Sequence, residues 1–153
     1  MFDTQLDGLY VWMAVGAVSV AVFGVVTQLP TAAPPDGADA AQTIDEVATS
    51  PPGSVATRSL DAEAWSLTTR RIGLRSEAGT VHETLLRPIV PAVNASLVAV
   101  LDGDHPSTTF DNAAEFERAT EAAATNDTRW RPAPDQLTVR RVAWGGVDVT
   151  LVG

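Results

Sequence analysis

The sequence contains no cysteine and no lysine, and these two absences exclude several classes of protein. Without cysteine there is no disulfide, no thiol nucleophile, no thiolate metal site and no attachment point for a lipoprotein anchor. All ten basic residues are arginine and stand against nineteen acidic residues, so the formal charge is −9. Because no basic stripe is present to displace phosphate counterions, nucleic acid is not expected as a partner.

The acidic excess predicts a protein that works in concentrated salt. At molar salt the Debye length falls to ~3 Å, so repulsion among surface carboxylates is screened. Arginine keeps a weakly hydrated cation that pairs bidentately with carboxylate. These features indicate a halophile, most simply a haloarchaeon. A GC-rich genome would also explain the missing lysine, but it explains the acidic excess poorly.

Signatures of catalysis and of metal or nucleotide binding are missing as well. No G-x-S-x-G, Walker loop or G-x-G-x-x-G occurs, and the two histidines, His82 and His105, have no partner at metal-binding helical spacing. The segment 102–105 (DGDH) resembles a calcium loop but lacks its twelve-residue length and terminal Glu, which favours a solvated turn. We expect no enzymatic activity, no catalytic residue, no cofactor and no metal.

The longest uncharged stretch runs from Gly8 to Thr27. Twenty residues at 1.5 Å rise span ~30 Å, the thickness of a bilayer core. We therefore predict a leader at 1–7 and a single transmembrane helix at 8–29 that contacts the lipid bilayer. A secretory signal cleaved near Ala33 is the alternative, although the acidic leader and the long apolar run are unusual for one.

Orientation in the membrane rests on indirect signals, because no arginine flanks the apolar segment. The leader is short, as in signal anchors, and two of the three asparagines lie in glycosylation sequons: Asn94 (Asn94-Ala95-Ser96) and Asn126 (Asn126-Asp127-Thr128). Both are candidate glycosylation sites. We expect a protein of the cell membrane with its C-terminal domain outside the cell.

Residues 30–53 are expected to form a linker that carries one short amphipathic helix. Pro30 ends the membrane helix, and a Pro- and Gly-rich spacer follows. From Asp39 to Thr49 the apolar residues recur at helical spacing, and Asp39 is placed to cap the helix. The stripe comprises Ala40, Ile44, Val47 and Ala48.

Residues 54–153 are expected to form an acidic domain of α+β class, a small antiparallel sheet with helices packed on one face. Strands are predicted between Trp65 and Val93, with a hairpin turn at 77–79, while 96–101 fits either a helix or a strand. Residues 112–124 have capping-box spacing and an apolar face typical of a helix. Gly145-Gly146 joins two strands in a hairpin whose facing pairs place Val142, Trp144, Val147, Val149 and Leu151 on a buried side and Arg141, Ala143, Asp148 and Thr150 on a wet side.

Three arginine-containing features are candidate binding groups. The pairs Arg70-Arg71 and Arg140-Arg141 could hold an anionic partner, although arginine in an acidic protein more often compensates nearby carboxylates. Trp130, between two arginines, could contact a partner, although covering the edge of the core is the simpler role.

The helix at 44–51 (IDEVATSP), together with the apolar N-terminal segment and the C-terminal run from Trp130 to Gly153 (WRPAPD…VRRVAWGGVDVTLVG), resembles an uncharacterised family of haloarchaeal membrane-anchored proteins. That family is associated with type IV pilus-like secretion genes and has no assigned activity. The resemblance covers nearly the whole chain and implies a lineage and a genetic neighbourhood rather than a mechanism.

Together these features predict a membrane-anchored, non-enzymatic accessory or minor pilin-like component of an archaeal pilus or secretion apparatus. Its partners would be other envelope or secretion proteins. Prepilin processing is not indicated, because Asp7 precedes Gly8 where a basic residue is usual. The alternatives are an anchored extracytoplasmic ligand-binding or sensor domain and a membrane hydrolase with dispersed residues.

Overall fold

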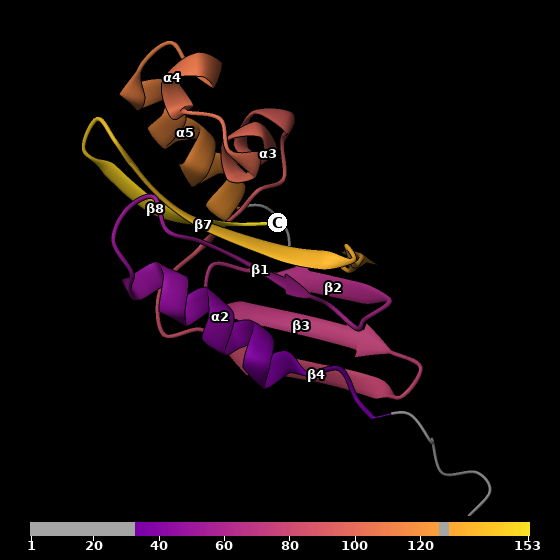
Figure 1. The fold of residues 1–153 in the computed structure, drawn as a ribbon. Coiled ribbons are helices and arrows are strands. Elements are labelled where there is room, and N and C mark those ends of the chain that lie inside the picture. Colours follow the sequence, from indigo (N-terminus) through magenta and orange to yellow (C-terminus); the bar gives the residue numbers. More distant parts are fainter. Residues whose placement is uncertain (1–32, 126–128) are drawn as a thin grey trace, which may run out of the picture. The chain divides into compact units, whose positions relative to one another are not determined.

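A computed structural model of the chain describes residues 33–125 and 129–153, almost all within one compact unit that begins at Pro34. The predicted membrane helix at 8–29 and the sequon asparagine Asn126 lie outside the described residues. Within the described part of the chain, no helix is long and apolar enough to cross a bilayer. The described residues form helices and two four-stranded sheets (Figure 1).

Helix α2 (Gly37–Thr49) confirms the predicted apolar stripe, whose four members are all buried. Its cap differs from the prediction. The helix begins earlier, because the Asp36 carboxylate accepts a hydrogen bond from the backbone N–H of Asp39 at 3.0 Å and satisfies one of the free donors of the first turn.

Helix α2 is part of the compact unit and not of a linker. It contacts strands of both sheets, and Ile44 is completely buried in the same cluster as residues of each sheet. The compact unit therefore begins at Pro34 and not at residue 54. The amphipathic pattern shows only that one face of this helix must be covered, and the covering residues come from far along the chain.

The first sheet has the strand order β1-β7-β8-β5. Its strands are β1 (Val55–Ser59), β7 (Gln136–Trp144), β8 (Val147–Val152) and β5 (Val90–Pro91). The β7–β8 hairpin has the predicted register, with Trp144 opposite Val147 and Val142 opposite Val149. Strand β5 lies at the edge, where a proline without an N–H is tolerated, but it runs parallel to β8.

The second sheet has the order β4-β3-β2-β6. Its strands are β2 (Ala64–Leu67), β3 (Arg71–Ser76), β4 (Gly79–Thr84) and β6 (Arg131–Pro132). The predicted hairpin is confirmed, because Ser76 pairs with Gly79 across a two-residue turn. Ile72 and Leu74 on β3 are both buried. Strand β6 pairs antiparallel with β2 at Ala64 and Trp65.

Helices α3 (Ala95–Asp102), α4 (Pro106–Thr109) and α5 (Ala113–Ala124) gather on one side of the β7–β8 hairpin (Figure 1). The ambiguous segment 96–101 is thus helical. Helix α5 has the predicted cap, since the Asn112 side chain accepts from the backbone N–H of Glu115 at 2.9 Å. Phe116 is fully buried and packs against Phe110, with ring centroids 5.3 Å apart.

The first sheet carries buried residues on both faces and is accompanied by a second sheet, which corrects the expectation of one small antiparallel sheet. On the predicted wet side, Ala143 and Asp148 near the turn are exposed as expected. Val142 and Leu151 face the cluster under α3 and α5, whereas Val139 and Val152 face the cluster shared with α2 and the second sheet. The wet side was inferred from residues near the turn. Farther from the turn the same side carries apolar residues, and Thr150 is buried as well.

Candidate functional site

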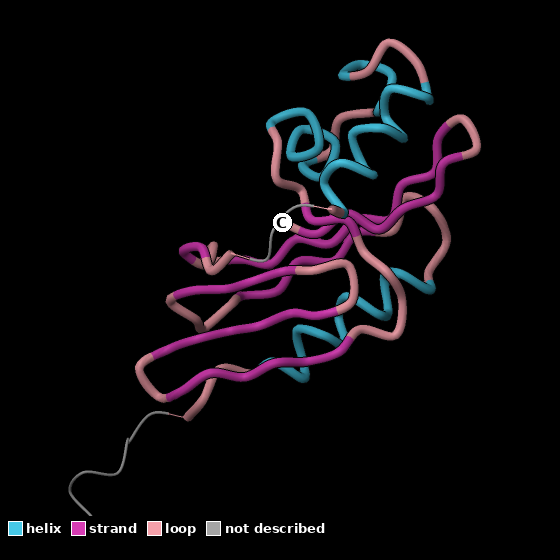
Figure 2. Tube along the Cα trace, turned by 180° about the vertical axis from the view of Figure 1, so that it is seen from behind, coloured by secondary structure: helices cyan, strands magenta, loops and turns pink. Residues whose placement is uncertain are grey.

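The face of the second sheet that points away from the core carries polar and cationic side chains. Strand alternation places Arg71, Gly73 and Arg75 of β3 on this face, and the hairpin register brings His82 opposite Gly73 and Thr84 opposite Arg71. Ile72 and Leu74 point the other way, into the cluster with α2. Seen from behind, the strands of this sheet have α2 on their far side (Figure 2). The face is therefore open to a partner.

Two hollows lined by arginine side chains have volumes of about 360 Å³ and about 440 Å³. The larger one lies on the open face of the second sheet, and we call it the basic hollow. Its lining residues are Ser66, Thr68, Arg70, Arg71, His82, Thr84 and Trp130. They include two guanidinium groups, an imidazole and three hydroxyls but no carboxylate. Such a set suits an oxygen-bearing anion.

Gly73 lies close to two side chains that line the basic hollow. A Cβ atom at this position would lie 2.7 Å from His82 Nδ1 and 2.7 Å from Ser66 Oγ. Both distances are well below van der Waals contact, so a larger residue would force the His82 and Ser66 side chains apart. The absence of a side chain at Gly73 thus leaves the space that these two polar groups occupy.

Trp130 forms one wall of the basic hollow and is held in place by two contacts. The Arg75 guanidinium carbon lies 4.5 Å from the centroid of the Trp130 ring, a cation–π geometry. The His82 ring is inclined to the indole at 58°, with centroids 5.7 Å apart. The tryptophan comes from the segment before β6, so the pairing of β6 with β2 brings it to this face.

The backbone at Arg70 and Arg71 is well fixed although both side chains are exposed. The Arg70 carbonyl accepts from the Leu85 N–H at 2.8 Å, and the Arg71 carbonyl accepts from the Thr68 N–H at 2.9 Å. Neither guanidinium forms an ion pair with a carboxylate in the part of the chain that the structure describes. Two cations on a rigid support therefore remain available in a protein with net charge −9.

Other arginines do compensate nearby carboxylates or carbonyls. Arg58 pairs with Asp39, and Arg140 Nη1 donates to the Val100 carbonyl at the end of α3 at 3.0 Å. Arg141 binds Asp148 bidentately, with Nε–Oδ1 3.0 Å and Nη2–Oδ2 2.7 Å. Through these hydrogen bonds the pKa of Asp148 is lowered and the pKa of Arg141 is raised from their ordinary values. The compensating role expected for the arginine pairs thus holds for Arg141 but not for Arg70 and Arg71.

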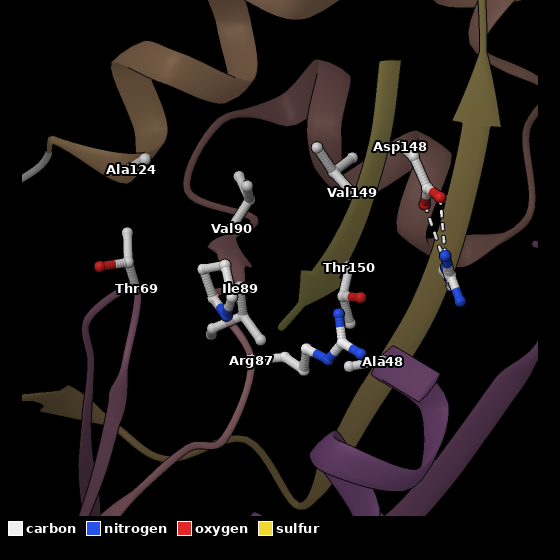
Figure 3. A pocket seen from close by; sticks show the side chains of 11 residues that line it. Ala48, Thr69, Arg87, Ile89, Val90, Ala124, Asp148, Val149 and Thr150 are labelled. Carbon is white, nitrogen blue, oxygen red and sulfur yellow. Dashed lines mark hydrogen bonds and ion pairs between the residues drawn. The ribbon is translucent and has the colours of Figure 1, made fainter. Parts of the chain in front are cut away.

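The second hollow lies between the end of α2, the Arg87–Val90 segment and β8 (Figure 3). Its residues are Ala48, Thr69, Arg87, Pro88, Ile89, Val90, Ala124, Arg141, Asp148, Val149 and Thr150. Figure 3 shows the Arg87 side chain extended across it and the Arg141–Asp148 ion pair at its rim. Because Asp148 already neutralises Arg141, this hollow offers fewer free donors than the basic hollow.

The remaining candidate residues occupy structural positions. The exposed Asn94 caps α3, its Oδ1 accepting from the Leu97 N–H at 2.8 Å, which leaves the side-chain nitrogen that a sugar would modify outside this bond. His105 Nδ1 lies 2.8 Å from Ser107 Oγ at the start of α4, and its ring packs against Trp144. In the two described ranges, no group of three or more His, Cys, Asp or Glu residues is placed to hold a metal.

The sequence singled out Arg70, Arg71, His82 and Trp130 separately but did not bring them together in one hollow. The alternation on β3 and the hairpin turn were sufficient to place His82 and Thr84 beside Arg71. Trp130 was not recoverable in this way, because β6 reaches β2 from more than sixty residues downstream. Local periodicity carries no information about such a pairing.

Comparisons with known proteins give one match. The model of a family of unknown function, DUF7283, matches residues 3–142. No curated protein and no solved structure matches the chain. The match confirms membership of an uncharacterised family, while the haloarchaeal origin, the membrane anchor and the link to secretion stay predictions.

Proposed function

The chain belongs to the family of unknown function DUF7283, and from this premise we propose that it is a membrane-anchored, non-enzymatic accessory or minor pilin-like subunit of an archaeal pilus or secretion apparatus. In this proposal residues 8–29 span the cell membrane, and the domain that begins at Pro34 lies outside the cell and binds other envelope proteins.

The observation that carries the proposal is the uncharged stretch Gly8–Thr27, which ends a few residues before the compact unit. Twenty mostly apolar residues match the ~30 Å hydrocarbon core of a bilayer. Only a short Pro- and Gly-containing segment separates the stretch from α2, whose Ile44 is completely buried. A domain tethered this closely is held at the membrane surface, as a subunit of an envelope assembly must be.

The layout of the compact unit also supports a pilin-like role. Its first element is a helix that packs its apolar face against strands of two sheets. An apolar N-terminal segment followed by a helix packed on a small sheet domain is the architecture of pilins in general. The support is architectural, because fold alone does not establish function.

The non-enzymatic part of the proposal rests on how the two histidines are used. His105 caps a short helix and packs on Trp144, and His82 leans against Trp130. Among the described residues, neither histidine forms a hydrogen bond or ion pair with a carboxylate that could orient it as a general base.

An anchored ligand-binding or sensor domain is the second candidate, and the basic hollow favours it. A depression of about 440 Å³ lies within the size range of small-molecule sites. In that case the protein would be recovered alone, with a small anionic molecule bound.

The test starts with the full-length protein in its native host. The proposal expects it in the membrane pellet, released by detergent but not by high salt, together with an assembly ATPase or a polytopic platform protein. A V15R/V20R variant should shift to the supernatant, since each arginine near the middle of a membrane helix costs about 2.5–3.5 kcal/mol of insertion free energy. A variant with the same two charges on the domain surface, V55R/V98R, is the matched control and should stay in the pellet.

Recovery of the native protein in the high-speed supernatant, with its first thirty residues still attached, would contradict the anchor. Recovery from membranes without any apparatus protein, but with a bound small anion, would favour the sensor alternative. Mass spectrometry of the same material reports whether the N-terminus is intact, cleaved after Gly8 or cleaved after Ala33.

A further inference from the structure

The basic hollow is unusual in its charge. The chain carries nineteen acidic residues and ten arginines, and the lining of this hollow includes Arg70, Arg71 and His82 without any carboxylate. Within the described residues, Arg70 and Arg71 have no ion-pair partner. Two exposed guanidinium groups without a carboxylate partner can therefore accept an anion from another molecule.

From this charge, and resting on the proposed function, we propose that the basic hollow and the adjoining Arg75 form a docking surface for an acidic, extended segment of a partner protein in the envelope assembly. Carboxylates of the segment would pair with the guanidinium groups of Arg70 and Arg71. The hydroxyls of Ser66, Thr68 and Thr84 would donate further hydrogen bonds to them.

The spacing of the cations favours an extended chain over a compact ion. Arg71 and Arg75 lie on the same face of β3, four residues apart, which corresponds to ~13 Å along a strand. That backbone separation matches two side chains four residues apart on an extended partner segment. An extended peptide, whose alternate side chains are about 6–7 Å apart, can present one carboxylate near each end of the surface.

The surface is also organised before any partner binds. The carbonyls of Arg70 and Arg71 are fixed by hydrogen bonds to Leu85 and Thr68, and Arg75 is stacked on Trp130. The backbone that carries Arg70 and Arg71 is therefore already ordered, and only their side-chain rotamers lose conformational entropy on binding. The guanidinium group of an arginine can bind a carboxylate through two parallel hydrogen bonds.

A binding assay with the full-length protein in detergent tests the proposal. The probe is a fluorescein-labelled oligoglutamate peptide, and oligoglutamine of the same length is its uncharged control. Fluorescence anisotropy measures the dissociation constant at several KCl concentrations. We expect binding of oligoglutamate only, which weakens as salt rises because exposed charges are screened.

Matched variants locate the binding. R70Q/R71Q should raise the dissociation constant about tenfold or more, because two charge-assisted contacts are removed. R87Q/R118Q changes the net charge by the same amount at arginines outside the basic hollow. Its dissociation constant for oligoglutamate should stay within about twofold of the wild-type value. R70K/R71K keeps the charge but loses the bidentate geometry, so an intermediate loss is expected. Near-UV circular dichroism confirms that each variant is folded.

Four results would overturn the proposal: equal binding of oligoglutamine, unchanged binding by R70Q/R71Q, an equal loss in R87Q/R118Q, or tighter binding of oligothymidylate than of oligoglutamate. Displacement of the peptide by inorganic phosphate at similar concentrations would also overturn it and indicate a site for a free oxyanion. Because the assay needs no membrane apparatus, its failure beside normal membrane recovery rejects the docking surface alone and leaves the proposed function standing.

Discussion

Two asparagine side chains stabilise the first turns of helices. Asn94 is both a sequon residue and the cap of α3, and Asn112 caps α5 in the same way. Each side-chain oxygen satisfies a backbone N–H that has no partner within its helix. The same asparagine therefore has a structural role whether or not it carries a sugar.

Replacing Asn94 by alanine should lower the free energy of unfolding by about 1 kcal/mol, because the bond to the Leu97 N–H is lost. The Asn94→Asp variant removes the sequon but keeps an accepting oxygen, so it should remain close to wild type. Urea unfolding of the two variants measures the difference. An equal loss in both would assign the effect to glycosylation rather than to the cap.

The Arg141–Asp148 ion pair predicts a pH dependence of stability. Hydrogen bonding to Arg141 places the pKa of Asp148 in the folded state below its ordinary value in the unfolded state. As the pH falls, Asp148 is therefore protonated first in the unfolded chain. The contribution of the ion pair to the free energy of unfolding is complete above the ordinary pKa of Asp. It is lost as the pH falls through the lower, folded-state pKa.

The D148N variant should therefore be less stable than wild type at neutral pH, and the difference should shrink in acid. Thermal unfolding of both proteins measures this difference in stability. The measurements run from neutral pH down to about pH 3, which is below the ordinary Asp pKa of ~4. D102N, at an exposed aspartate for which no ion pair is found in the described ranges, is the control. A D148N effect that stays constant over this range would show that the carboxylate charge is not responsible.

Among the elements, α2 is the one whose role differed most from expectation. Its apolar stripe was evident in the sequence, but the stripe alone does not say whether the helix is a peripheral part of a linker or a component of the core. The structure places Ile44 at zero exposure between residues of both sheets.

The Ile44→Ala variant should lose about 2–5 kcal/mol of unfolding free energy, the usual cost of a cavity at a fully buried position. Gln42→Ala, on the exposed face of the same helix, removes one hydrogen bond to Glu46 and should cost less than about 0.5 kcal/mol. Denaturant unfolding compares the two. Similar small losses would mean that α2 is not integral to the domain.

For the whole molecule, the net charge of −9 predicts that salt stabilises the fold. Raising KCl from about 0.1 M to about 1 M shortens the Debye length from ~10 Å to ~3 Å and screens repulsion among carboxylates. The melting temperature should rise over this range, and it should rise less for E117Q/E121Q, which removes two exposed charges of α5. A melting temperature that falls with salt would show that attractive ion pairs dominate.

The sequence by itself determined the features that depend on neighbouring residues. These are the cap of α5, the apolar faces of α2 and α5, the turn of the β3–β4 hairpin, and the β7–β8 hairpin with its register. Each follows from local spacing, because periodicities of two and of 3.6 residues are written directly in the chain.

Only the tertiary structure decided which surfaces are covered. It divided the strands between two sheets, buried both faces of β7 and β8, and brought Trp130 beside His82 and Arg75. These arrangements join segments far apart in the sequence. They depend on which apolar faces pack together. Each long-range pairing must also offset a loss of chain entropy. Local sequence patterns encode neither the packing partners nor this entropy cost.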